Sequence, residues 1–103
     1  MKIDLYIDGQ KKTFSTPFVP MLAKRKFLEI QAKEEKMENP TTEEILDLDE
    51  EMYSILTDVI FRNQFTLEEL YNGAELKYVQ DKLSEAVFGR KPKVDVEGND
   101  QGE

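Results

Sequence analysis

The sequence predicts an α+β fold in which an N-terminal β-hairpin precedes a bundle of three to four α-helices and a disordered C-terminal tail. Three observations predict it: apolar and polar residues alternate before an Asp-Gly pair, later apolar residues recur at helical spacing behind capping motifs, and the C-terminus is charged and aperiodic. We expect one domain over residues 1–89 and a disordered tail over 90–103, because 103 residues suffice for a single hydrophobic core.

The hairpin is predicted over residues 2–15. The outgoing strand places three apolar side chains on one face, namely Ile3, Leu5 and Ile7. Asp8 and Gly9 suit a type I′ turn, because both tolerate a positive φ, and a two-residue turn pairs Ile7 with Gln10. An isolated hairpin is only marginally stable in water, so we expect helices or another subunit to cover the apolar face.

The first helix is predicted over about residues 20–36. Pro20 suits the first turn of a helix, where its missing N–H has no helical partner. The apolar positions form a broad stripe that consists of Met21, Leu22, Phe27, Leu28, Ile30 and Ala32. The basic run Lys24-Arg25-Lys26 lies near the N-terminus of this helix, where positive charge opposes the macrodipole. The run therefore needs a compensating negative partner.

The second helix is predicted over about residues 42–63, after a break at Asn39-Pro40. Thr41 and Glu44 form a capping box, in which each side chain accepts a hydrogen bond from the backbone N–H of the other residue. The core-facing stripe consists of Ile45, Leu48, Met52, Ile55 and Val59. Four more residues widen it and leave apolar surface for another chain: Leu46, Tyr53, Leu56 and Ile60.

Two shorter helices are predicted over about residues 66–72 and 74–88. A second capping box, Thr66 with Glu69, begins the first of them, and Gly89 is placed to end the second. The apolar stripe of the last helix consists of Leu76, Val79, Leu83 and Val87. The aromatic residues expected in the core are Phe61, Phe65, Tyr71 and Tyr78.

The composition argues against an enzyme. The chain has no histidine and no cysteine, which removes the commonest general base, the commonest transition-metal ligand and the thiol nucleophile. The acidic residues within 47–51 fit a solvated helix face better than a calcium loop, because no glycine provides the sharp turn. We expect no catalytic residues, no cofactor and no metal site.

The composition also narrows the partners and the compartment. The formal net charge is −8, which disfavours nucleic acid because every phosphate contact needs a positive partner. No apolar run reaches the roughly 18 residues of a membrane span, and the N-terminus does not resemble a signal peptide. The absence of cysteine suits a reducing compartment, so we expect a cytoplasmic protein that contacts no membrane.

The charge is unevenly distributed along the chain. Residues 1–33 hold seven basic and three acidic side chains, whereas residues 34–58 hold one basic and ten acidic ones. The basic run 24–26 either pairs with this acidic stretch or binds an acidic or amphipathic partner helix. The second role predicts a partner-binding set that consists of Phe18, Met21, Leu22, Lys24, Arg25, Lys26, Phe27 and Leu28. The opposed charges also favour head-to-tail homo-oligomers, as rings or open spirals.

The order of these motifs resembles a known family. A hairpin with Asp8-Gly9 at its turn precedes TPFVPMLAKRKFLEIQAK, and an acidic helix precedes NQFTLEELYNGAELKYVQDKL. Over roughly residues 2–88 the chain resembles the small tail assembly chaperones of long-tailed phages and prophages of Gram-positive bacteria, the short product of a frameshifted pair. The resemblance implies a non-enzymatic role, with no catalytic residues to carry over.

The resemblance also implies partners. Such proteins coat the long, helical tape measure protein in the host cytoplasm during tail assembly and leave before the virion is complete. A longer form, made by frameshifting, adds a domain that recruits tail tube subunits. The sequence leaves a second functional class open: an acidic phage-encoded inhibitor that mimics DNA and blocks a host nucleic-acid enzyme. Such a mimic needs acidic residues over much of its surface, whereas residues 1–33 are net basic.

Overall fold

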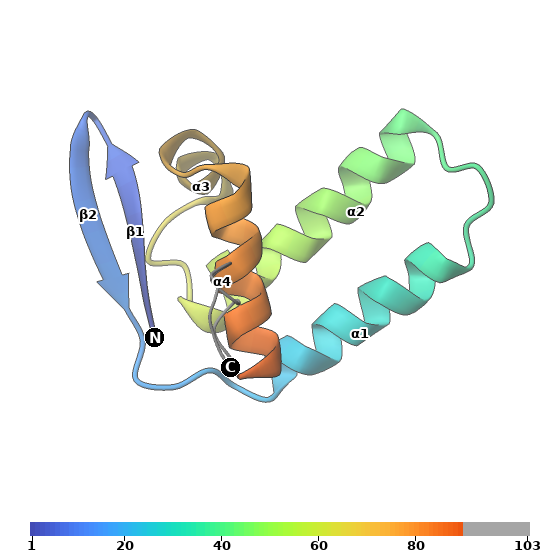
Figure 1. The fold of residues 1–103 in the computed structure, drawn as a ribbon, viewed down its shortest axis with the longest axis horizontal. Helices are drawn as coiled ribbons and strands as arrows, with labels where there is room; N and C mark the ends of the chain where they lie inside the picture. Colours follow the sequence, from blue (N-terminus) through green and yellow to red (C-terminus); the bar gives the residue numbers. More distant parts are fainter. Residues whose placement is uncertain (90–103) are drawn as a thin grey trace, which may run out of the picture.

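A computed structural model describes residues 1–89, so the tail predicted over 90–103 lies outside the described residues. Within residues 1–89 the predicted fold class is confirmed, because an antiparallel hairpin precedes four α-helices and one π-helical segment (Figure 1). The elements are β1 (Lys2–Ile7), β2 (Gln10–Ser15), α1 (Leu22–Glu35), α2 (Thr42–Ser54), η1 (Ile55–Ile60), α3 (Leu67–Gly73) and α4 (Leu76–Phe88). The hairpin lies at one side of the molecule, and α1 and α2 extend as a pair at the other (Figure 1).

The hairpin forms with the predicted turn and register. Asp8 and Gly9 both have positive φ, at 55° and 78°, and Ile7 pairs with Gln10. Ile3 and Leu5 are fully buried on the helix-facing side of β1. The chain's own helices therefore cover the apolar face.

The edge of β1 that does not pair with β2 is covered as well. A Cβ atom on Gly73 would lie 2.8 Å from the carbonyl oxygen of Tyr6, so α3 approaches the strand more closely than any larger residue allows. The backbone N–H of Asp4 donates a hydrogen bond to the Tyr78 hydroxyl of α4 over 2.9 Å. Residues of β2 are exposed apart from the half-buried Phe14, so the open edge of the hairpin is that of β2.

The first two helices begin differently. Helix α1 starts at Leu22, two residues later than predicted, with no side-chain cap and no acidic residue in its first turn. Helix α2 starts behind the predicted capping box: the N–H of Glu44 donates to Thr41 Oγ1 over 3.1 Å, and the N–H of Thr41 donates to Glu44 Oε1 over 2.8 Å. Helix α2 is therefore closed at its N-terminus by its own side chains.

The second helix was predicted to run to about residue 63, whereas its α-helical part ends at Ser54 and its helical path ends at Ile60. After Ser54 the chain widens into the π-helical segment η1, in which the N–H of Phe61 donates to the carbonyl of Leu56, five residues earlier, over 2.9 Å. Arg62 and Asn63 then adopt positive φ, which is incompatible with a continuing helix. The wider turn places four residues in the core, namely Ile55, Leu56, Thr57 and Ile60.

The last two helices follow their end signals. The Thr66–Glu69 capping box is present at the start of α3. Helix α4 begins two residues later than predicted, because Ala74 and Glu75 are extended. Gly89 ends it with a left-handed φ of 69°, and its N–H donates to the carbonyl of Glu85.

Three residues that were predicted to be in the core are exposed. Ile45, Tyr71 and Leu76 expose 45%, 53% and 64% of their surface. Ile45 and Leu76 occupy the first turns of α2 and α4, and the ring of Tyr71 meets the edge of the Tyr53 ring at a centroid distance of 6.2 Å. The largest fully buried side chains are Phe61, Ile3, Leu5, Leu56, Ile60 and Leu70.

Candidate partner-binding surface

Helix α1 presents an outer face of mixed basic and apolar character. We call it the basic stripe, and it consists of Met21, Lys24, Arg25 and Leu28. Residues spaced by three and four lie on one side of a helix, and these four border a shared open hollow together with Glu29 and Ala32. Met21 exposes 92% of its surface. The structure therefore brings half of the predicted partner-binding set together on one face.

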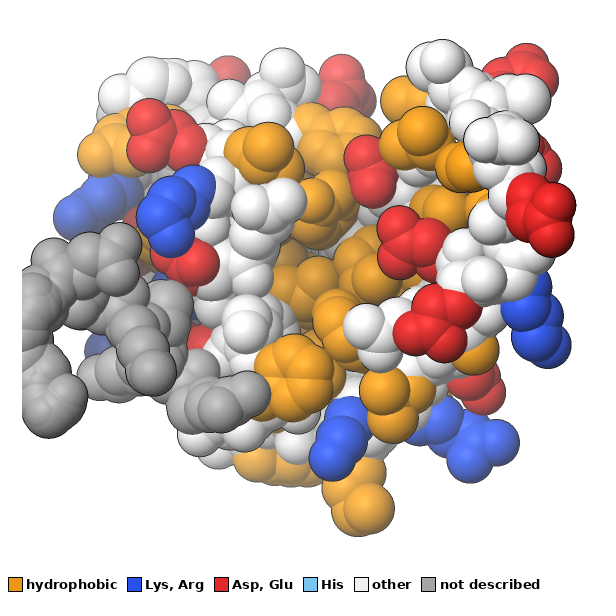
Figure 2. Space-filling view, turned by 45° about the vertical axis from the view of Figure 1, so that its right-hand side comes forward, with side chains coloured by type: hydrophobic (Ala, Val, Ile, Leu, Met, Phe, Trp, Pro, Cys, Tyr) orange, Lys and Arg blue, Asp and Glu red, His pale blue; other side chains and the backbone are white. Residues whose placement is uncertain are grey.

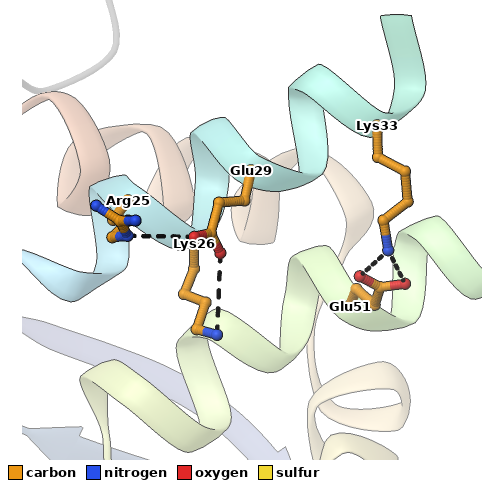
Figure 3. A network of polar contacts seen from close by, with 5 residues as sticks. All are labelled: Arg25, Lys26, Glu29, Lys33 and Glu51. Carbon is orange, nitrogen blue, oxygen red and sulfur yellow. Dashed lines mark hydrogen bonds and ion pairs between the residues drawn. The ribbon is translucent and has the colours of Figure 1, made fainter. Parts of the chain in front are cut away.

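Two of the three charges of the basic run pair with Glu29 of the same helix. Arg25 Nε lies 3.2 Å from Glu29 Oε2, and Lys26 Nζ lies 4.0 Å from Glu29 Oε1 (Figure 3). The side chain of Lys24 forms no ion pair within residues 1–89. In this part of the chain the basic run does not pair with residues 34–58, so that alternative is not found.

A different lysine joins the two helices. Lys33 Nζ of α1 lies 2.8 Å and 2.9 Å from the two carboxylate oxygens of Glu51 on α2 (Figure 3). Both side chains are about half exposed. The pair closes one side of a second open hollow between α1 and α2, which Lys26 also borders, with Ile30 and Ile55 in its lining.

The other candidate residues lie apart from the basic stripe. Phe27 is half buried, and its ring packs edge-on against Phe88 of α4 at a centroid distance of 5.5 Å. Leu22, at the start of α1, is exposed. Phe18 lies in the loop before α1, exposed on one side, with the Arg62 guanidinium 5.5 Å from its ring centroid. Phe27 thus serves the packing of the domain, whereas Phe18 and Leu22 remain accessible beside the stripe.

Helix α2 carries a second stripe that was not predicted as a site, and it is exposed apart from the half-buried Tyr53. We call it the acidic stripe, and it consists of Leu46, Asp49, Glu50 and Tyr53. Leu46 exposes 61% of its surface, and the carboxylates of Asp49 and Glu50 form no ion pair within the described residues 1–89. Sequence reasoning expected Leu46 and Tyr53 to leave apolar surface for another chain, but it assigned the acidic residues within 47–51 to a solvated face and so did not join the four residues into a site.

An apolar hollow of about 180 Å³ adjoins the acidic stripe. It is lined by Tyr53, Leu70, Tyr71, Ala74, Leu76 and Val79. Figure 2 shows apolar side chains gathered in the middle of this face, with acidic side chains on the side where α2 lies. Burial raises the pKa of the Tyr71 hydroxyl, and the negative charges of Asp49 and Glu50 raise it further. The hollow is therefore lined by apolar and aromatic side chains, and the negative charges of Asp49 and Glu50 act on Tyr71 in its lining.

The two stripes consist of side chains suited to protein contacts. Residues 1–89 contain no cluster of three or more His, Cys, Asp or Glu side chains placed to hold a metal ion. None of the helices in that range is long and apolar enough to span a membrane.

Fold and surface together define a small α+β domain with two exposed helix faces of opposite charge. The chain belongs to the phage tail chaperone family, whose sequence model, described as a phage tail chaperone protein, matches residues 1–101. No curated protein and no solved structure matches the chain. Membership confirms the resemblance to tail assembly chaperones and does not favour the DNA-mimic alternative.

Proposed function

We propose that this phage tail chaperone binds the tape measure protein and keeps it soluble during tail morphogenesis. The observation that carries the proposal is the basic stripe of α1, whose apolar and basic side chains are exposed within a domain that is otherwise folded around its own core. Family membership supports a role with tail proteins as partners, and chaperones of this family are generally non-enzymatic.

The chemistry of the stripe suits an amphipathic helix. Met21 and Leu28 contact apolar side chains of such a client, and the flexible thioether of methionine adapts to irregular surfaces. Lys24 and Arg25 pair with acidic residues at the client's margin. Phe18, Leu22 and Lys26 extend the contact on either side, whereas Phe27 supports α1 from beneath.

The remaining parts of the role follow the family pattern. The protein acts in the host cytoplasm and leaves before the virion is complete. It self-associates into rings or open spirals, and a longer frameshifted form shares its fold and recruits the tail tube protein. Sedimentation at low and high salt tests the self-association, since contacts between opposite charges weaken as salt is added.

Charge reversal tests the client-binding face. The variant K24E/R25E/K26E is expected to lose client binding, because the basic side chains that pair with the client become repulsive. The fold is expected to persist, since exposed ion pairs such as Arg25–Glu29 contribute only about 0–1 kcal/mol each. The measurement is co-expression with the tape measure protein, with client solubility and pull-down as readouts and circular dichroism as the fold control.

A matched variant on the hairpin controls for net charge. The variant K2E/K11E/K12E reverses three exposed lysines of β1 and β2, so the total charge changes equally while α1 stays intact. It is expected to keep the client soluble. If the α1 variant keeps the client as soluble as the wild type does, the binding face lies elsewhere on the domain.

A further inference from the structure

Helices α1 and α2 carry the same pattern of side chains on their outer faces, with opposite charge. Each pattern consists of an apolar residue, a charged pair three and four positions later, and a second apolar residue seven positions after the first. On α1 the residues are Met21, Lys24, Arg25 and Leu28. On α2 they are Leu46, Asp49, Glu50 and Tyr53. Spacings of three, four and seven share a helix face, so the two stripes are opposite in charge and equal in spacing.

We propose that the basic stripe of one copy docks on the acidic stripe of a second copy. The inference rests on the proposed self-association and assigns it a surface. Each stripe spans eight residues, or about 10 Å of helix from its first residue to its last. Because each charged pair lies midway between its apolar residues, the two helices can align in either direction with basic opposite acidic and apolar opposite apolar.

Within residues 1–89 no ion pair joins the two stripes of one chain. Leu28 precedes the buried Ile30 by two residues, and Leu46 precedes the buried Leu48 by two residues. Two residues turn a helix by about 200°, so Leu28 and Leu46 point away from the core that their helices cover. Tyr53 is half buried at the margin of that core, and Glu50 borders the open hollow between α1 and α2. Lys33 and Glu51, on other sides of the same helices, form the ion pair between α1 and α2.

The charges of both stripes lack strong partners within residues 1–89. Lys24, Asp49 and Glu50 form no ion pair there, and Arg25 has only the exposed Glu29 of its own helix. Glu29 lies at the margin of the basic stripe and is the one negative charge beside it. The net charges are therefore complementary across the contact.

The hollow beside the acidic stripe provides the apolar part of the contact. Tyr71 and Leu76 expose more than half of their surface next to Tyr53. An incoming Met21 or Leu28 fills this hollow and removes those side chains from water. An apolar hollow beside the acidic side chains of α2 matches a basic stripe with apolar ends, which is what α1 presents.

The contact joins two different faces, so it repeats from copy to copy and gives rings or open chains. The client and the neighbouring copy then compete for the basic stripe. Binding of the tape measure protein therefore releases copies from the free oligomer.

A charge swap tests the contact. The variants K24E/R25E and D49K/E50K each place like charges on both stripes, so each alone is expected to associate at least about tenfold more weakly than the wild type. An equimolar mixture is expected to regain association, because every contact in it again joins opposite charges. Sedimentation velocity at low salt measures both effects on full-length protein, and the quadruple variant K24E/R25E/D49K/E50K is expected to associate like the wild type.

Two variants control for net charge and folding. K11E/K12E on β2 matches the first swap variant, and E34K/E38K, at exposed positions near the end of α1 and in the loop after it, matches the second; both are expected to associate normally. The proposal is overturned if the wild type stays monomeric up to about millimolar concentration, if the mixture fails to associate, or if the controls lose association equally.

Client solubility separates this inference from the proposed function. D49K/E50K keeps the basic stripe and is expected to keep the tape measure protein soluble. Loss of client solubility with unchanged self-association would place the client on the acidic stripe and overturn the docking proposal. Failure of the wild type itself to solubilise the client would reject the proposed function, while the charge swap would still report on self-association.

Discussion

Helices α1 and α2 are neighbours of nearly equal length, yet they are stabilised in different ways. Helix α2 begins at a capping box with Glu43 and Glu44 in its first turn, where negative charge is favoured by the macrodipole. Helix α1 has neither a cap nor an acidic first turn, and its basic run lies where the macrodipole disfavours it. A helix that gains so little from its own sequence must be held by the rest of the fold.

The contacts of α1 show what holds it. Ala23 and Ile30 are buried against the core, and Phe27 packs on Phe88 of α4. The basic run is then tolerated at the surface because its position is set by contacts on the opposite side of the helix. The core-facing sides of the two helices therefore stabilise the fold, while their solvent-facing sides remain available for partners.

The largest expected effect is on the free energy of unfolding, and it distinguishes a buried residue of η1 from an exposed residue of α2. Ile55→Ala is expected to lower the free energy of unfolding by about 2–5 kcal/mol, because Ile55 is 2% exposed and its loss leaves a cavity. Leu46→Ala, at an exposed position of α2, is expected to change it by less than about 0.5 kcal/mol. Urea unfolding followed by circular dichroism measures both, and equal midpoint shifts would contradict the distinction.

A smaller effect distinguishes the two helix starts. Thr41→Ala removes the hydroxyl that accepts the N–H of Glu44 and is expected to cost about 1 kcal/mol. Met21→Ala at the start of α1 is expected to have almost no effect, because the Met21 side chain makes no capping hydrogen bond. Thermal unfolding of the two variants beside the wild type provides the measurement. A larger loss of thermal stability for Met21→Ala than for Thr41→Ala would show that α1 depends on its first turn.

The smallest expected effect concerns the ion pair between the helices. Lys33 and Glu51 are about half exposed, so a double-mutant cycle of their alanine variants is expected to give a coupling of only about 0.2–1 kcal/mol. The coupling should fall as sodium chloride is raised, because exposed charges are screened. A coupling that exceeds this range and ignores salt would mean that the pair is a principal link between α1 and α2.

Local signals in the sequence determined the hairpin and three of the helix ends. The Asp8-Gly9 turn gave the strand register, because a two-residue turn leaves one alignment of its flanking residues. The capping boxes at Thr41 and Thr66 and the left-handed Gly89 placed three helix ends to within a residue or two. Each of these signals acts between residues close in the chain, so no knowledge of the tertiary structure is needed to interpret it.

Packing between distant residues decided the rest. The second helix changed to the π-helical segment η1 because that geometry buries Leu56 and Ile60 in the same core as Ile3, more than fifty residues earlier in the chain. Tyr71 and Leu76 were left exposed beside an acidic stripe, although their spacing alone fits a core position as well. Helical spacing tells which residues share a side of a helix, but only the arrangement of the other elements decides whether that side meets the core or the solvent.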